Sequence, residues 1–206
     1  MNGKRLAAVA FAASLAMPLR AATYLPMSDG DLAAAAPVIV RATPVSQQVR
    51  LETIGGQQLP FTIVTLQRVE SLRGTIAESF SLRLPGGRID DTAWSLPGVP
   101  RLENSSDVVL MLRPAGRAGE WHLTELGLSA FALAADESGR KFAVRNEFAR
   151  LEDLAVSKRD GVADAYRTKE SRAPARDAES FLAALRAVGR GEPMPDVALA
   201  EPKGEI

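Results

Sequence analysis

His122 is the only histidine in the chain, and two carboxylates, Glu120 and Glu125, lie close to it in sequence. Histidine and carboxylate side chains are common zinc ligands. On a strand, however, His122 and Glu120 would share one face while Glu125 points the other way. The second histidine that a zinc-protease helix needs is also absent. We therefore interpret His122 as a surface histidine beside Trp121 and expect no metal site.

Ser129 lies in "GLSAF", residues 127–131, which has part of the pattern of a nucleophile elbow. The pattern lacks its final glycine, and no helix is predicted to follow, although such an elbow joins a strand to a helix. A serine triad would also have to use His122, which is close to Ser129 in sequence. We therefore expect Ser129 to be structural and predict no catalytic residue.

Asp90 and Asp91 follow the turn "LPGG" and form a pair of adjacent carboxylates. Such a pair can do acid–base work, but it supplies too few oxygen ligands for a calcium site. Turn formation and solubility are their ordinary roles. The alternative is a hydrolase whose site is assembled from scattered Ser, Asp and Glu side chains.

Trp94 lies in "DDTAWSLPGVPRL", a long segment that contains Pro97 and Pro100. Aromatic side chains on rigid loops are common binding anchors. The alternative, which the usual burial of tryptophan favours, is that Trp94 closes one end of a barrel. If the protein has a ligand site, we expect it in the loop of residues 86–101. The candidate binding residues are Asp90, Asp91, Trp94 and Arg101.

The first residues, "MNGKRLAAVAFAASLAMPLRAATYLP", have the three parts of a secretory signal peptide. Lys4 and Arg5 precede a short apolar run, and small residues follow it. We predict a signal peptide at residues 1–21 with cleavage after Ala21. Cleavage after Ala22 and an uncleaved anchor are the alternatives. The apolar run is shorter than the roughly 20 residues that cross a bilayer, which favours a signal peptide over a membrane span. We expect no transmembrane span after cleavage.

The amino-acid composition limits the cellular compartments in which the protein is expected and the chemistry that its side chains can perform. The chain of 206 residues has no cysteine, so it has no thiol nucleophile, thiolate metal site or disulfide. A secreted domain without disulfides favours a bacterial periplasmic or extracellular protein that is stabilised by its core. The 25 basic and 25 acidic residues balance, which argues against a nucleic-acid partner. We expect no cofactor.

The segment "TIVTLQRVESLRG", residues 62–74, fits two kinds of element. Its apolar residues recur every three positions, as on one face of a helix, yet its first four residues are all β-branched, which favours a strand. Pro60 and Gly74 leave little room for helix ends. We predict a strand with a β-bulge near Gln67 or Arg68, after which Val69 and Leu72 point inward.

The neighbouring segments also predict strands. "ESFSLRLPGG" alternates, "SDVVLMLRP" is an apolar run of strand length, and "EWHLTELGLSAFALAADESGRKFAVRN" adds two or three more. "DLAAAA" predicts a short helix capped by Ser28 or Asp29, and Pro44 predicts a break or bulge in the strand that follows. The fold class is mainly β, an antiparallel OB-like barrel or a sandwich.

The C-terminal part predicts a helix on that barrel. "DAESFLAALRAVGRG" has Asp177 as its cap and one apolar stripe, and Gly189 ends it. The expected organisation is a β-barrel domain at 22–147, a charged connection at 148–175, the helix at 176–190 and a disordered tail at 191–206.

Several motifs together resemble a known family. They are "DLAAAAPVIVRATPV", "FTIVTLQRVESLRG", "LRLPGG", "LPGVPRLENSSDVVLMLRP" and "LTELGLSAFAL". The arrangement is similar to a small exported bacterial β-domain that occurs alone or N-terminal to matrixin-like metalloprotease domains. The resemblance covers roughly residues 28–146. The chain departs from it at residues 104–107, where Asn-Ser-Ser-Asp replaces Glu-Gly-Glu, and at residues 129–131, where Ser-Ala-Phe stands in place of "QG.F".

More distantly, the arrangement is similar to the netrin-like OB-fold barrel of tissue metalloprotease inhibitors. Those inhibitors reach zinc through an N-terminal cysteine, which this chain lacks. The sequence therefore favours an exported, non-catalytic binding or accessory module whose partner is an envelope or secreted protein such as a protease. A structural component of the envelope is the other alternative beside the hydrolase.

Overall fold

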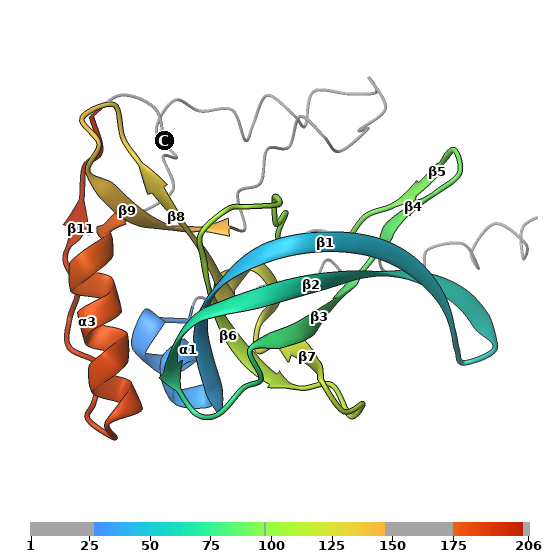
Figure 1. Ribbon diagram of the computed structural model, residues 1–206, viewed down its shortest axis with the longest axis horizontal. Coiled ribbons are helices and arrows are strands. Elements are labelled where there is room, and N and C mark those ends of the chain that lie inside the picture. The colour runs from blue at the N-terminus through green and yellow to red at the C-terminus, as the bar shows by residue number, and fades with distance from the viewer. Residues whose placement is uncertain (1–26, 97, 147–174, 204–206) are drawn as a thin grey trace, which may run out of the picture.

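A computed structural model describes residues 27–96, 98–146 and 175–203 (Figure 1). The predicted signal peptide and all but the last residue of the predicted charged connection lie outside the described residues. The helical elements are α1 (Asp29–Ala35), the 3-10 helix η1 (Leu126–Ser129) and α3 (Ala178–Gly189). The strands are β1 (Val38–Ile54), β2 (Gln57–Arg73), β3 (Ser79–Pro85), β4 (Gly87–Ile89), β5 (Thr92–Trp94), β6 (Val108–Pro114), β7 (Glu120–Leu123), β8 (Ala130–Ala135), β9 (Lys141–Arg145), β10 (Ala175–Asp177) and β11 (Leu199–Ala200).

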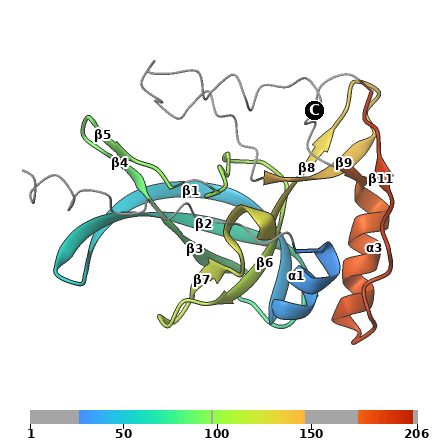
Figure 2. The ribbon, with the colours of Figure 1, turned by 180° about the vertical axis from the view of Figure 1, so that it is seen from behind.

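Five strands form a ring. Their order is β1-β2-β3-β7-β6, and β6 pairs back onto the first part of β1. The fold is thus mainly β and OB-like, as predicted from the alternating segments. The ring is unevenly closed, because β3 and β7 share only two residue pairs. That contact is parallel, so the sheet is mixed rather than wholly antiparallel. Figure 2 shows the opposite side of this ring.

β6 separates two hydrophobic cores. Val108, Leu110 and Leu112 face the inside of the ring, while Val109 and Met111 face a second core beneath α1 and α3. Successive side chains of a strand point to opposite faces. A strand that is buried on both faces therefore needs an unbroken apolar run, and "VVLML" is that run. Beyond β6, the sheet continues through β8, β9, β10 and β11.

Residues 62–73 are a strand, as predicted from their β-branched residues. Arg41 lies opposite Glu70 and Ala42 lies opposite Arg68, so Val69 is an extra residue in the ladder. The expected bulge is present one or two positions later than predicted. Leu72 is buried, but the prediction that Val69 points inward is wrong, since 55% of its surface is exposed. The reason is that Val69 is itself the bulged residue.

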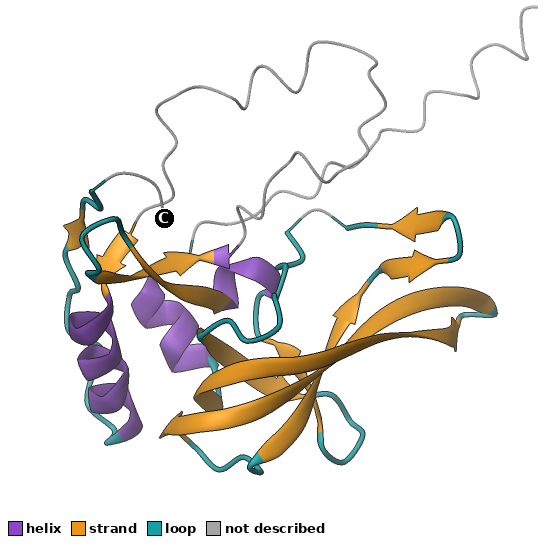
Figure 3. Cartoon of the chain, turned by 45° about the horizontal axis from the view of Figure 1, so that its top comes forward, coloured by secondary structure: helices purple, strands orange, loops and turns teal. Residues whose placement is uncertain are grey.

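The first strand also contains an irregularity where proline predicted one. The register shifts between Pro44 and Ser46, so Val45 has no residue opposite it. Beyond this point β1 and β2 run on together past the ring as a long curved hairpin. The short β4–β5 hairpin extends on the same side of the molecule (Figure 3).

α1 and α3 begin at the predicted caps. The Ser28 hydroxyl accepts a hydrogen bond from the Asp31 N–H, and the Asp31 carboxylate accepts one from the Ser28 N–H. Asp177 accepts a hydrogen bond from the Ser180 N–H. The predicted apolar stripe of α3, which includes Phe181 and Leu185, is buried in the second core.

Part of the C-terminal tail is attached to this core. β11 pairs with β10, and Met194 and Val197 pack against the second core. The Lys203 N–H donates to the Asp136 carboxylate, and the pKa of Asp136 falls to about 2 because Ser138 and Lys203 both donate to it. Residues 191–203 therefore have a place in the fold, in contrast with the disorder that their composition predicted.

Candidate binding site

A pocket of about 210 Å³ lies between the β1–β2 hairpin and the segment of residues 84–102. It is lined by Gln47, Thr62, Leu84, Pro85, Gly86, Gly87, Trp94, Ser95, Leu96, Val99, Pro100, Arg101 and Leu102. We call this the hairpin pocket. Most of its wall comes from the loop of residues 86–101, where the sequence predicted a ligand site.

Two glycines hold the β4–β5 hairpin close to the long hairpin. The Gly86 N–H donates to the Pro60 carbonyl over 2.9 Å, and the Thr62 hydroxyl donates to the Gly86 carbonyl over 2.9 Å. Gly86 has φ +96°, and a Cβ there would lie 2.7 Å from the Trp94 carbonyl oxygen. A Cβ on Gly87 would collide with Val49. Only glycine permits this approach, so the "PGG" motif shapes the pocket.

The far end of the loop is fixed to the barrel. The Gln47 side-chain amide donates to the Leu102 carbonyl, and the Ser105 N–H donates to the Pro44 carbonyl over 2.9 Å. Leu102 itself is buried in the core of the ring. The Gly98 carbonyl accepts from the Gly127 N–H over 2.7 Å. These attachments position the pocket wall from both sides.

Trp94 projects into solvent at the pocket rim, where 51% of its surface is exposed. The prediction that Trp94 closes an end of the barrel is therefore wrong, because its strand belongs to the small hairpin and not to the ring. Leu96 lies beside it in sequence and is 48% exposed. Val49, which adjoins Gly87, is also exposed. Exposed apolar residues that lie together mark interaction sites more often than singly scattered ones do.

The other predicted binding residues are divided between two places. Arg101 lines the hairpin pocket together with Trp94. Asp90 and Asp91 form the turn between β4 and β5, where both are exposed and Asp90 has φ +50°. They do not line the pocket. Their position fits the turn-forming role expected from the sequence.

His122 and Ser129 have mainly structural surroundings. His122 is half-buried on β7, its Nδ1 lies 3.3 Å from the Arg83 carbonyl oxygen, and burial lowers the pKa of its imidazole. Ser129 is buried, and its hydroxyl accepts a hydrogen bond from the Glu125 N–H over 2.7 Å. In the described parts of the chain, no group of three or more metal-ligating side chains comes together.

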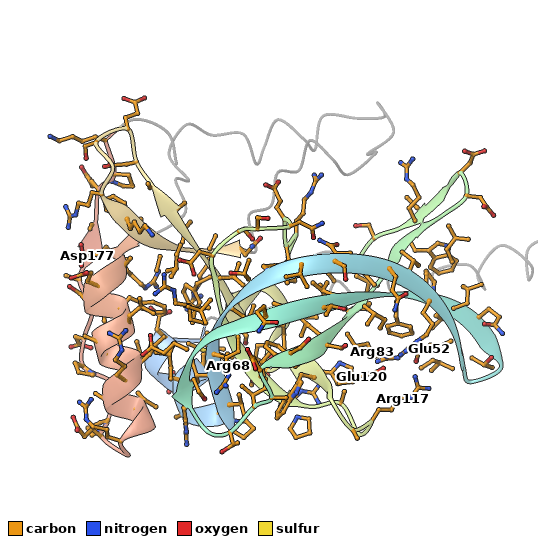
Figure 4. All side chains as sticks on the ribbon, viewed as in Figure 1. Glu52, Arg68, Arg83, Arg117, Glu120 and Asp177 are labelled. Atoms are coloured by element: carbon orange, nitrogen blue, oxygen red, sulfur yellow. The ribbon has the colours of Figure 1, made fainter. Side chains whose placement is uncertain are left out.

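An ionic cluster on the curved hairpin was missed by sequence reasoning. Glu52 accepts from Arg50 over 2.6 Å and from Arg83 over 2.8 Å, and Arg50 also donates to Glu120 over 2.9 Å. Arg117 lies 3.5 Å from Glu52. Figure 4 shows Glu52, Arg83, Arg117 and Glu120 gathered under the hairpin. The members come from three separate segments of the chain, so no local spacing could have indicated the whole cluster.

This cluster predicts a pH-dependent stability. The Arg83 and Arg50 guanidinium groups lower the pKa of Glu52 from 4.5 to about 2. A lowered folded-state pKa means that the stabilisation is complete above about pH 4.5 and is lost as the pH falls toward 2. We expect Glu52→Gln to cost about 2 kcal/mol of unfolding free energy at pH 7, as is usual for charged hydrogen bonds. Urea titrations at pH 7 and pH 3 measure it.

The difference between Glu52→Gln and the wild type should shrink at pH 3. At that pH the unfolded-state carboxylate, with its ordinary pKa of 4.5, is mostly protonated, whereas the folded-state carboxylate stays mostly ionised, and this proton uptake favours unfolding of the wild type. Glu103→Gln, which alters an exposed glutamate outside the cluster, should change little at either pH. An equal cost of Glu52→Gln at both values would contradict the role given to this carboxylate.

A second pocket, of about 600 Å³, lies at the start of α1 beside a buried ionic group. Asp29 accepts from Arg145 over 2.7 Å and forms an ion pair with Arg176. Arg145 also donates to the Met27 carbonyl over 2.9 Å. These bonds attach the beginning of α1 to β9 and β10. We therefore assign this group to the architecture of the second core.

Comparison with known proteins adds no assignment. No model of a known protein family matches the chain, and no curated protein is similar to it. Within the described residues, no helix has the length and apolar character needed to cross a membrane.

Proposed function

We propose that the protein is an exported binding or accessory module that recognises another envelope or secreted protein through the hairpin pocket and its rim. The hairpin pocket is built from apolar surface and backbone rather than from paired catalytic groups. Such a site suits the recognition of a partner rather than the catalysis of a reaction. The resemblance to domains that precede matrixin-like proteases makes a secreted protease the first partner class to test. The signal-peptide pattern of residues 1–21 supports export.

The observation that carries this proposal is the exposed pair Trp94 and Leu96 beside the pocket. Tryptophan is enriched among the few residues that dominate protein–protein affinity, especially where it sits next to a preformed depression. The backbone bonds of Gly86 and the burial of Leu102 hold the site in place before binding. A site that is already ordered loses less conformational entropy when its partner docks.

The size of the pocket favours a protein partner over a small metabolite. Pockets for drug-sized ligands usually enclose about 300–1,000 Å³, whereas the hairpin pocket has about 210 Å³. That volume suits a single apolar side chain presented by a partner. Trp94 and Leu96 would then cover the surface around the inserted side chain.

A comparative capture experiment tests the proposal. The tagged full chain would be expressed in its own host, cross-linked in intact cells and culture supernatant, and its partners identified by mass spectrometry. The Trp94→Ala variant should lose the specific partner. With the purified partner, affinity should fall at least about 30-fold, which corresponds to the 2 kcal/mol typical of a dominant interface residue.

Val69→Ala is the matched control, because Val69 is an equally exposed apolar residue that does not line the hairpin pocket. It should retain the partner. Identical capture by the wild type and Trp94→Ala would exclude this site. Loss of the partner in both variants would point to a general loss of apolar surface and would also count against the hairpin pocket.

A further inference from the structure

The long hairpin has one free edge. β1 pairs with β2 as far as Ile54, but β6 covers its other edge only from Val38 to Ala42. In the part of the chain that the structure describes, no strand pairs with that other edge over residues 48–54. An exposed strand edge is a template for pairing with another strand.

The direction of the backbone groups on this edge follows from Pro60. Leu51 lies opposite Pro60 in the hairpin. Pro60 has no N–H, and its carbonyl accepts from Gly86 on the side away from β1. In an antiparallel ladder, opposite residues exchange both hydrogen bonds or neither. Leu51 and Pro60 therefore exchange none, and the Leu51 N–H and C=O point to the free edge.

The same alternation places the backbone groups of Val49 and Thr53 on the free edge, two residues either side of Leu51. Their side chains share the face of Leu51, whereas Arg50 and Glu52 lie on the opposite face. The exposed edge is thus a row of three residues with available backbone donors and acceptors. Leu51 is 51% exposed and Val49 is 37% exposed, so this face also carries uncovered apolar surface.

The segment "QVRLETI", residues 48–54, is complementary to itself when reversed about Leu51. In an antiparallel pair of two copies centred there, Leu51 meets Leu51, and Val49 meets Thr53 of the second copy. Arg50 then lies opposite Glu52 of the second copy at the positions where side chains approach most closely. Opposite charges on facing strands stabilise a pair, whereas like charges oppose it.

We propose that two copies of this chain associate through antiparallel pairing of their β1 edges, with the two-fold axis at Leu51. The backbone hydrogen bonds come from Val49, Leu51 and Thr53. The ion pairs between Arg50 and Glu52 extend the ionic cluster of each copy across the axis. A two-fold interface is self-complementary by necessity, and this edge meets that condition in both its charges and its backbone register.

The absence of cysteine from the chain permits a direct test by introduced cysteine. Residues facing each other as a hydrogen-bonded antiparallel pair have Cα atoms about 5.5 Å apart, within the range that a disulfide spans. The full chain with Leu51→Cys should form a disulfide-linked dimer under mild oxidation. Val45→Cys is the matched control, because Val45 is equally exposed and lies on the same strand, six residues from the proposed axis. It should cross-link at least tenfold less.

Sedimentation of the unmodified protein provides the second measurement. The wild type should show concentration-dependent dimerisation, and Leu51→Pro should raise the dissociation constant at least tenfold. Proline at this position removes an edge donor but no bond of the hairpin, so the fold should persist. Circular dichroism checks this.

The Trp94→Ala variant should dimerise like the wild type, which separates this interface from the hairpin pocket. Three outcomes would overturn the proposal: a wild type that stays monomeric at every concentration, equal cross-linking of the two cysteine variants, or undiminished association of a folded Leu51→Pro.

Discussion

Replacing Asp29 by alanine should lower the free energy of unfolding by about 3 kcal/mol. Asp29 is the carboxylate that Arg145 and Arg176 share, and all three side chains are largely buried. Removing one partner of a buried ion pair typically costs about 3–5 kcal/mol, because the remaining charge stays in a poorly solvated place. The adjoining pocket of about 600 Å³ can admit water, so we expect the lower end of that range. Urea unfolding at pH 7 measures it.

Asp31→Ala is the control for Asp29→Ala. Asp31 is also an acidic residue in the first turn of α1, but its contacts are with the Ser28 cap. Loss of this capping interaction should cost about 1 kcal/mol. In the double variant Asp29→Ala/Arg145→Ala, the costs should add to less than the sum of the single changes, since the two side chains interact directly. Equal effects of Asp29→Ala and Asp31→Ala would show that the buried ionic group contributes nothing beyond capping.

Gly189→Ala should destabilise the protein by about 3 kcal/mol, at the upper end of the cost of overpacking. Gly189 is the last residue of α3 and lies against β2. A Cβ at this position would lie less than 3.0 Å from the Leu72 carbonyl oxygen. The backbones of Gly189 and Leu72 both belong to regular elements, α3 and β2, so neither can move aside easily. The helix would have to shift away from the second core, and thermal or urea unfolding would record the loss.

Gly30→Ala is the matched control, because it makes the same change in α1. A Cβ on Gly30 would have only ordinary contacts, the nearest at 3.7 Å. Alanine favours the helix over glycine by about 0.5–1 kcal/mol, so Gly30→Ala should leave stability unchanged or raise it. A Gly189→Ala variant that is as stable as Gly30→Ala would mean that α3 does not approach Leu72 so closely.

The Gly189 contact also shows where sequence reasoning reached its limit. The sequence indicated correctly that α3 ends at Gly189, and the Asp177 cap and the apolar stripe were equally visible. The sequence suggested that glycine served to end the helix. The structure gives it a second purpose, a close approach between elements more than a hundred residues apart. Local patterns report caps and periodicity, but they carry no information on which distant backbone will lie alongside.

For the strands, too, local patterns were visible in the sequence, whereas contacts between distant segments were not. Alternation and β-branched residues identified the strands of the ring, and Pro44 marked a real irregularity in β1. Val69 was misplaced because a shift of one residue in the bulge moves a side chain to the other face. The parallel contact between β3 and β7 depends on the path of the chain around the ring, and no single segment encodes it.

For the candidate site, the sequence pointed to the loop that lines most of the hairpin pocket, but it did not indicate the shape of that pocket. Trp94 and Arg101 do line one pocket, as the grouping in loop 86–101 suggested. Asp90 and Asp91 are separated from it because a tight turn carries them to the hairpin tip. Val49 was not predicted as part of the rim, since its place depends on the crossing of two hairpins. The ionic cluster around Glu52 was likewise a product of tertiary structure.

The burial of β6 on both faces has a consequence for how the molecule unfolds. Val109 and Met111 belong to the core beneath the helices, and Val108, Leu110 and Leu112 belong to the core of the ring. Because both cores pack against β6, detaching this strand from one core would also disrupt the other core. The two cores therefore share one cooperative transition, and their amide protons should exchange with solvent only when the whole domain opens.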